Sequence, residues 1–248
     1  MDRINLCSDI LKCSLLSKEG HIASSFSILD FLIALYDGEL SKEDLFVLSK
    51  GHASLGLYSV LKEKGIISGE DFFSFASFNS ILGGHPSSKK IPTLKISTGS
   101  LGHGLPFSCG LALGKKIKNE NGKVYCLIGD GESNEGTTWE SALVASSYSL
   151  ENLVCVMDFN KSGERAIKID SAYEKFQSFK WNCLEIDGHS HLEISKALNW
   201  TRVSKGPHFI NMHTTKGKGC KIMENNPEWH HKYPNSEEEL KKILESLY

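Results

Sequence analysis

One segment, from Lys123 to Asn160, constrains the fold of this chain more than any other. It begins with the apolar run VYCLI, which is typical of a strand buried inside a parallel sheet. Gly129-Asp130-Gly131 follows directly, so the backbone can turn sharply and leave one carboxylate at the carboxyl end of that strand. The segment therefore predicts a strand and an acidic turn, followed by a helix and a second strand.

The second apolar run, Leu153 to Met157, delivers Asp158 and Asn160 to the same edge of the sheet. Ligands bind at this edge in open parallel sheets. A carboxylate, an amide oxygen and a main-chain carbonyl would converge there on one hard cation, and Mg²⁺ held by few protein oxygens completes its shell with phosphate and water. Gly-Asp-Gly alone also occurs in ordinary turns. The whole pattern, with its closing Asn, favours a magnesium-diphosphate site over a plain turn.

Composition indicates a globular enzyme in a reducing compartment. The 248 residues suffice for one large α/β domain or two small ones, and the net charge of −2 gives no reason to expect nucleic acid or membrane as a partner. The seven cysteines lack a C-x-x-C pair, and several lie within apolar runs. We interpret them as reduced core residues of a cytoplasmic protein.

Hydrophobic periodicity predicts alternating helices and strands after a helical start, with Ser24 or Ser25 as a plausible N-cap of the second helix. This order favours an α/β fold in three layers, a parallel sheet with helices on both faces. Besides the segment described above, helices are expected at 2–17, 25–37, 53–64, 102–118, 172–180, 190–199 and 237–248, and strands at 45–48, 182–187 and 207–212.

Three histidines each lie in a turn beside glycine: His21, His52 and His85. Singly, each is more typical of a surface or capping histidine, but together, upstream of a cofactor motif, they predict a polar active-site wall. Histidine suits a reaction that moves protons to and from sugar hydroxyls near neutral pH. His85 also belongs to a long loop, 79–100, and loops of that length in compact domains are often functional.

The chain resembles the N-terminal half of a transketolase. The resemblance runs from about residue 20 to 235 and is carried by GHIASS, LSKGHASLGLYSVL, GGHPSSKKIPTLKISTGSLGHGL, GDGESNEGTTWESA, DFN and HTTKGKGCKIMENNPEWH. It implies the thiamin-diphosphate-binding fold, with residues 1–248 forming a single diphosphate-binding (PP) domain that has a helical N-terminal segment and a C-terminal helix. The pyrimidine-binding and C-terminal domains of the family would be absent.

The resemblance implies thiamin diphosphate and Mg²⁺, or Ca²⁺ or Mn²⁺ in its place, as cofactors. Asp130, Asn160 and the main-chain carbonyl near Ser162 would bind the metal. Further residues that would contact the cofactor are Gly129 and Gly131 at the diphosphate, His52, and Gly99, Ser100 and Leu101.

The resemblance also assigns the residues that would meet the substrate. His21 and His85 match histidines that contact the hydroxyls of the ketose donor, His52 lies near them, and His230 matches one near the reacting carbonyl. Glu135 matches an acid at the dimer interface that links two active sites. The implied reaction is transfer of a two-carbon ketol unit from a ketose, or its phosphate, to an aldose acceptor.

The chain departs from the family in three places. His103 replaces a usual glutamine, KSGERAIKI after Asn160 lacks the usual Ile-Asp-Gly ending, and the sequence ends after a capped helix at Tyr248. The resemblance implies that the half of the family that activates the cofactor would be absent from this chain. We therefore expect a two-gene transferase, in which a C-terminal transketolase-like subunit completes the active sites, most simply as an α2β2 heterotetramer. The alternative is that the chain is a truncated piece of a longer protein.

Alternatives remain open at this stage. A 1-deoxyxylulose-phosphate synthase-like enzyme and a 2-oxoacid dehydrogenase α-subunit share the metal motif, although the SKGHA and GGHP turns fit transketolase better. A non-catalytic interaction protein that kept the fold is a further possibility, which the presence of both Asp130 and Asn160 disfavours. The donor could be a pentose phosphate, an unusual pentulose or a nucleotide-linked sugar.

Overall fold

A computed structural model describes residues 1–165, 167 and 170–248 of the chain. Its centre is a five-stranded sheet in the order β1-β2-β3-β5-β4, and every neighbouring pair is parallel. The strands are β1 (Leu45–Leu48), β2 (Val124–Gly129), β3 (Leu153–Phe159), β4 (Asn182–Asp187) and β5 (His208–His213). The predicted parallel sheet is confirmed, and all five strands overlap the predicted positions.

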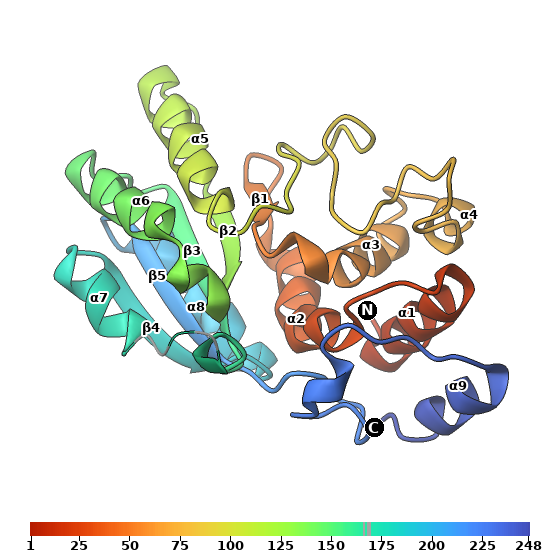
Figure 1. Ribbon diagram of the computed structural model, residues 1–248. Coiled ribbons are helices and arrows are strands. Elements are labelled where there is room, and N and C mark those ends of the chain that lie inside the picture. The colour runs from red at the N-terminus through yellow and green to blue at the C-terminus, as the bar shows by residue number, and fades with distance from the viewer. Residues whose placement is uncertain (166, 168–169) are drawn as a thin grey trace.

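Helices connect the strands and complete both ends of the chain. They are α1 (Arg3–Ser17), α2 (Ile22–Ala34), α3 (Ser54–Glu63), α4 (Gly69–Phe73), α5 (Gly104–Lys118), α6 (Gly136–Ser147), α7 (Ala172–Ser178), α8 (His191–Val203) and α9 (Glu237–Leu244). The termini lie close to each other, where α9 packs against α1 (Figure 1). No helix in the described part of the chain is long and apolar enough to cross a membrane.

Two apolar clusters form the core, one on each face of the sheet. Because side chains alternate along a strand, Tyr125 and Leu127 of β2 enter one cluster, while Cys126 and Ile128 enter the other. Both faces are fully covered, so β2 is apolar at every one of these positions. Figure 1 shows α5, α6 and α7 on one side of the sheet and α1, α2 and α3 on the other. This arrangement confirms the three-layer α/β prediction.

One local prediction was wrong, and one short helix was not predicted. α2 begins at Ile22 with His21 at its N-cap, whereas Ser24 and Ser25 are buried inside the helix. The helix starts early because Gly20, at φ +136°, turns the chain directly into it. The short helix α4 was not predicted, although Ser68 and Asp71 form a capping box at its start.

Candidate cofactor and substrate site

A cavity of about 330 Å³ opens at the carboxyl end of the sheet. Its lining comes from the segments that follow β1, β2, β3 and β5, from the start of α2 and from the loop before α5. Parallel strands direct their carboxyl ends to one edge, which explains why segments far apart in sequence meet here. The lining residues are His21, Ser24, Lys50, His52, His85, Gly99, Leu101, Gly129, Asp130, Gly131, Glu132, Asn160, Ser162, Gly163, Lys216 and His230.

Asp130 has a carboxylate in this cavity of which only one oxygen accepts a hydrogen bond from the described residues. Its Oδ1 accepts a hydrogen bond of 2.8 Å from the Gly131 amide, whereas its buried Oδ2 has no hydrogen-bond partner among the described residues. Burial, and then the nearby Asp158 carboxylate, raise the pKa of Asp130. A buried carboxylate oxygen without a donor is costly unless a cation or another ligand satisfies it. Asp130 is therefore suited to hold a metal ion.

Asn160 is oriented by the buried carboxylate of Asp158. The Asn160 Nδ2 group donates to Asp158 Oδ2 at 2.9 Å. Because a carboxylate only accepts, this contact identifies the amide nitrogen, and the amide oxygen Oδ1 therefore points away from Asp158. The same Asp158 oxygen accepts from Ser27 Oγ at 2.8 Å and forms an ion pair with Lys50, whose side chain is 2 % exposed. Burial acts to raise the pKa of Asp158, but Lys50 and these hydrogen bonds outweigh it and lower the pKa. Asp158 is thus a charged anchor for Asn160.

Two glycines allow the turns after β2 and β3 to approach each other. A Cβ on Gly163 would lie 2.7 Å from the Gly131 nitrogen and 2.8 Å from its Cα. No side chain fits at that distance, so the backbone itself forms this wall of the cavity. Backbone amides at such a wall are suitable donors for phosphate oxygens. The turns that carry Asp130 and Asn160 are held together here, which fits a metal-diphosphate group.

Three of the predicted histidines meet in one wall of the cavity. The ring of His21 lies edge-on to His52, with 5.1 Å between centroids, and edge-on to His230, at 5.4 Å. Burial lowers the pKa of His52 to about 2 and that of His21 to about 4, so both are neutral near pH 7. The Nδ1–H of His21 donates to the His230 carbonyl at 2.8 Å, which leaves Nε2 as an acceptor for a ligand hydroxyl.

Lys216 brings a positive charge to the same wall. Its Nζ donates to Nδ1 of His230 at 2.7 Å and to Oγ of Ser162 at 3.2 Å, and the residue is 8 % exposed. Because Nδ1 of His230 accepts this bond, a neutral His230 carries its proton on Nε2. Lys216 therefore links the metal-site turn to the histidine wall and offers a cation for an anionic ligand.

The loop before α5 is fixed to the cavity by the buried carboxylate of Glu132. Its Oε1 accepts from the Gly102 amide at 2.9 Å and its Oε2 from the Gly129 amide at 2.9 Å. Burial raises the pKa of Glu132, opposed by the hydrogen bond from Ser49. Gly102 adopts φ +77° and lies against Glu135, a combination that only glycine tolerates well. This anchoring places Gly99 and Leu101 at the cavity.

Most predicted site residues line the cavity, but two do not. Ser100 is exposed and contacts His103, and Glu135 is exposed at the start of α6. His103 occupies the N-cap position of α5, and its Nδ1 lies 3.0 Å from the Leu101 carbonyl and 3.2 Å from Ser100 Oγ, outside the cavity. Its difference from the family therefore lies beside the cavity wall. The predicted change in the segment 161–169 falls partly on residues 166 and 168–169, outside the described residues.

Sequence reasoning missed several residues of the site. Ser24, Lys50, Glu132, Gly163 and Lys216 line the cavity. Asp158, which the sequence did place at this edge of the sheet, lies directly behind the cavity, where it orients Asn160. Lys50 and Lys216 belong to the motifs SKGHA and HTTKGKG, which could have identified them, whereas the pairing of Lys50 with Asp158 has no local signal. His231 was also missed: its ring lies 4.6 Å from that of His21, and its Nε2 contacts Glu19 at 2.8 Å.

Comparison with known proteins agrees with this geometry. Residues 17–247 match the family described as transketolase, thiamine diphosphate binding domain. One subunit of the apulose-4-phosphate transketolase of Phocaeicola vulgatus is 37 % identical over 246 residues, covering 92 % of this chain and 86 % of that protein. Human transketolase is 34 % identical over 244 residues, with 92 % of this chain aligned to only 38 % of its own length.

Solved structures give the same result for the fold. The transketolase of Campylobacter jejuni superposes with a TM-score of 0.87 at 30 % identity, covering 98 % of this chain and 42 % of that one. The match to the Phocaeicola protein is nearly end to end, whereas full-length transketolases extend well beyond it. The sheet, the cavity and these similarities together lead to one conclusion: the chain belongs to the transketolase family and corresponds to its N-terminal, thiamin-diphosphate-binding part.

Proposed function

We propose that this chain is the diphosphate-binding subunit of a two-chain, thiamin-diphosphate-dependent transketolase. The observation that carries the proposal is the buried Asp130 Oδ2, which has no hydrogen-bond partner within the described part of the chain. It lies beside the oriented amide of Asn160, in the same cavity as three neighbouring histidines. Family membership supplies the reaction class, transfer of a two-carbon ketol unit between sugars. The whole chain would act as one PP domain.

The donor set fits a magnesium ion and a diphosphate. Asp130 and Asn160 would hold Mg²⁺ together with the main-chain carbonyl near Ser162, because carboxylate, amide and carbonyl oxygens are the ligands that hard cations prefer. The close turns of Gly131 and Gly163 would receive the diphosphate, with Lys216 adding positive charge. When bound, thiamin diphosphate would supply the carbon nucleophile that cleaves a ketose beside its carbonyl.

The histidine wall would bind the sugar and exchange its protons. Because Nδ1 of neutral His21 carries the proton, its Nε2 can accept a hydrogen bond or a proton from a sugar hydroxyl, and neutral His52 lies beside it. His230, with its proton on Nε2, can donate to a carbonyl or alkoxide oxygen in the cavity. His85 lines the cavity and would complete the polar wall on the side of the long loop.

A partner chain would cover the face formed by α5 and α6. Large apolar side chains are exposed along it: Phe107, Leu143, Val144 and Tyr148 are 41–56 % exposed. Exposed apolar side chains grouped on neighbouring helices are typical of an interface. Glu135 lies at the start of α6, at the end of this face nearest the cavity. These features support assembly with a C-terminal transketolase-like subunit, and α2β2 is the simplest closed arrangement.

The donor would be a ketose phosphate and the acceptor an aldose. Two similar proteins of matching length are named as subunits of apulose-4-phosphate transketolase, so apulose 4-phosphate is the first donor to assay, beside the common pentulose phosphates. The seven free cysteines support a reducing, cytoplasmic setting.

The test is co-expression with the product of a neighbouring gene that encodes the missing half, followed by light scattering and a coupled ketol-transfer assay. We expect activity only in the mixture, dependent on thiamin diphosphate and Mg²⁺, and lost in Asp130→Ala. Glu164→Ala, an exposed acid nearby on the chain, is the matched control and should remain active. A complex that decarboxylates pyruvate but transfers no ketol unit would contradict the proposal, and so would full activity of this chain alone.

A further inference from the structure

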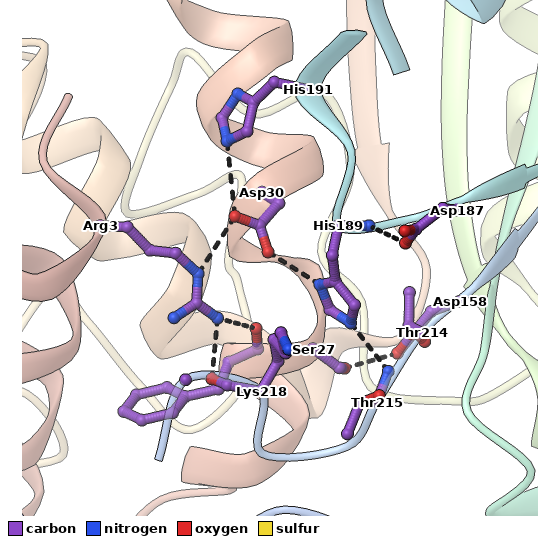
Figure 2. Close-up of polar contacts among 12 residues, drawn as sticks. Arg3, Ser27, Asp30, Asp158, Asp187, His189, His191, Thr214, Thr215 and Lys218 are labelled. Carbon is purple, nitrogen blue, oxygen red and sulfur yellow. Dashed lines mark hydrogen bonds and ion pairs between the residues drawn. The ribbon is translucent and has the colours of Figure 1, made fainter. Parts of the chain in front are cut away.

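His189 lies outside the cavity but forms two well-aligned polar contacts. It follows β4, and its side chain is 12 % exposed. Its Nδ1 lies 2.8 Å from Asp30 Oδ2, and its Nε2 lies 2.8 Å from the Thr215 amide nitrogen (Figure 2). A carboxylate only accepts and a backbone N–H only donates. The two contacts therefore assign the proton of His189 to Nδ1 and a lone pair to Nε2.

Asp30 is a fixed partner for His189. Its side chain, on α2, is 6 % exposed and accepts from Arg3 Nε at 3.1 Å. The Arg3 guanidinium also donates to the carbonyls of Phe26 and Lys218, so it joins α1, α2 and the segment after β5. Burial acts to raise the pKa of Asp30, but His189 and Arg3 outweigh it and lower the pKa. The Asp30 carboxylate can thus hold the imidazole in one orientation.

The turn that His189 contacts leads directly to Lys216. Thr214 is fixed by its amide, which donates to the Phe159 carbonyl at 3.1 Å, and by its hydroxyl, which donates to Asp158. On the far side, the Gly217 amide donates to the Ala23 carbonyl at 3.0 Å. Thr215, between these points, donates its amide to His189. The His189 contact therefore fixes the middle of the turn from which the Lys216 side chain enters the cavity.

We propose that His189, held by Asp30, is a positioning residue for Lys216, and that it acts through the amide of Thr215. The inference rests on the proposed function, in which Lys216 meets the anionic part of the cofactor. His189 would touch neither cofactor nor substrate. Loss of its Nε2 acceptor would leave a part-buried amide without a partner and loosen the turn, so Lys216 would spend less time at the cavity.

Two substitutions separate the two contacts of His189. His189→Asn places an amide near the Nδ1 position, so it can keep the bond to Asp30 but loses the acceptor for Thr215. His189→Gln reaches the Nε2 position and can restore that acceptor. His191→Asn is the matched control, because His191 also contacts Asp30, at 3.4 Å, but its side chain is 52 % exposed.

The first readout is amide hydrogen exchange of the full chain, followed in peptides that span residues 213–217. We expect exchange there to be about two- to tenfold faster in His189→Asn, the range that loss of one hydrogen bond produces, and close to wild type in His189→Gln and His191→Asn. Unchanged exchange in His189→Asn would overturn the inference. If His189→Asn were globally unfolded, the folded variant His189→Gln would decide instead. Slow amide exchange at residues 213–217 in His189→Gln would support the inference, and fast exchange there would overturn it.

The second readout is the affinity of the two-chain complex for thiamin diphosphate with Mg²⁺, measured by calorimetry. His189→Asn should weaken binding by about two- to tenfold, and the double variant with Lys216→Met should bind no more weakly than Lys216→Met alone. If the double variant lost as much affinity as the two single variants together, His189 would not act through Lys216, and the inference would be overturned. If the wild-type complex bound no thiamin diphosphate, the proposed function would fail, while exchange would still decide whether His189 fixes the turn.

Discussion

Replacement of Lys50 by methionine tests whether the buried ion pair beneath the cavity holds the fold together. Lys50 is 2 % exposed and Asp158 is 0 % exposed at their side chains, so neither charge is solvated by bulk water. Removal of one partner from such a pair costs about 3–5 kcal/mol, because the other charge is left buried and uncompensated. Asp158 retains donors from Ser27, Thr214 and Asn160, so we expect the lower end, about 3 kcal/mol.

The assay is urea denaturation at pH 7.5, followed by tryptophan fluorescence. In a thermal melt of the same variant, a loss of about 3 kcal/mol in the free energy of unfolding would correspond to a fall of roughly 6–12 °C in the melting temperature for a chain of this size. Lys118→Met is the matched control, since Lys118 is 71 % exposed and only reaches Glu120 at 4.0 Å. It should change stability by less than about 0.5 kcal/mol. A Lys50→Met protein within about 1 kcal/mol of wild type would refute the reasoning.

The same pair predicts a pH dependence. The pKa of Asp158 is lowered in the folded state, so its charge stabilises the wild type above the unfolded pKa near 4, and this stabilisation is lost as the pH falls through the folded pKa. In Lys50→Met the largest of the causes that lower this pKa is gone, whereas the hydrogen bonds from Ser27 and Thr214 remain. The stability gap between wild type and variant should therefore shrink as the pH is lowered below about 4. A gap that stays constant or widens would contradict the assignment.

Three further predictions follow from the site and the assembly face. Asp130→Ala should abolish Mg²⁺-dependent binding of thiamin diphosphate in calorimetry without lowering the melting temperature, because Oδ2 has no hydrogen-bond partner among the residues that the structure describes; retained binding would contradict the role of Asp130. The pKa of His21 is lowered to about 4, so the folded state binds fewer protons than the unfolded state and stability falls as the pH drops from about 6.5 to 4. His21→Gln should reduce this dependence of the free energy of unfolding on pH, measured by denaturation at a series of pH values. An unchanged pH dependence would contradict the lowered pKa of His21. Leu143→Asp should prevent assembly with the partner in light scattering, whereas Leu192→Asp, 64 % exposed on α8, should not; assembly of both would exclude the α5–α6 face.

The sequence by itself determined the elements whose causes are local. The apolar run before Asp130 and the glycines around it define a buried strand and its turn, because period and turn chemistry act over a few residues. The Asp-x-Asn after the second run likewise predicts the polar end of β3. The start of α2 was misplaced because a serine is a good cap in general, whereas here the turn at Gly20 decides the boundary.

Only the tertiary structure decided which distant side chains meet. His21 and His230 are 209 positions apart, and Lys50 and Asp158 are 108 apart, yet each pair is in contact. Neither pairing leaves a local pattern, because it depends on the strand order β1-β2-β3-β5-β4, which brings the carboxyl ends of separate strands to one edge. The residue types at the site can therefore be read from the chain, while its charge pairs and proton positions arise from packing.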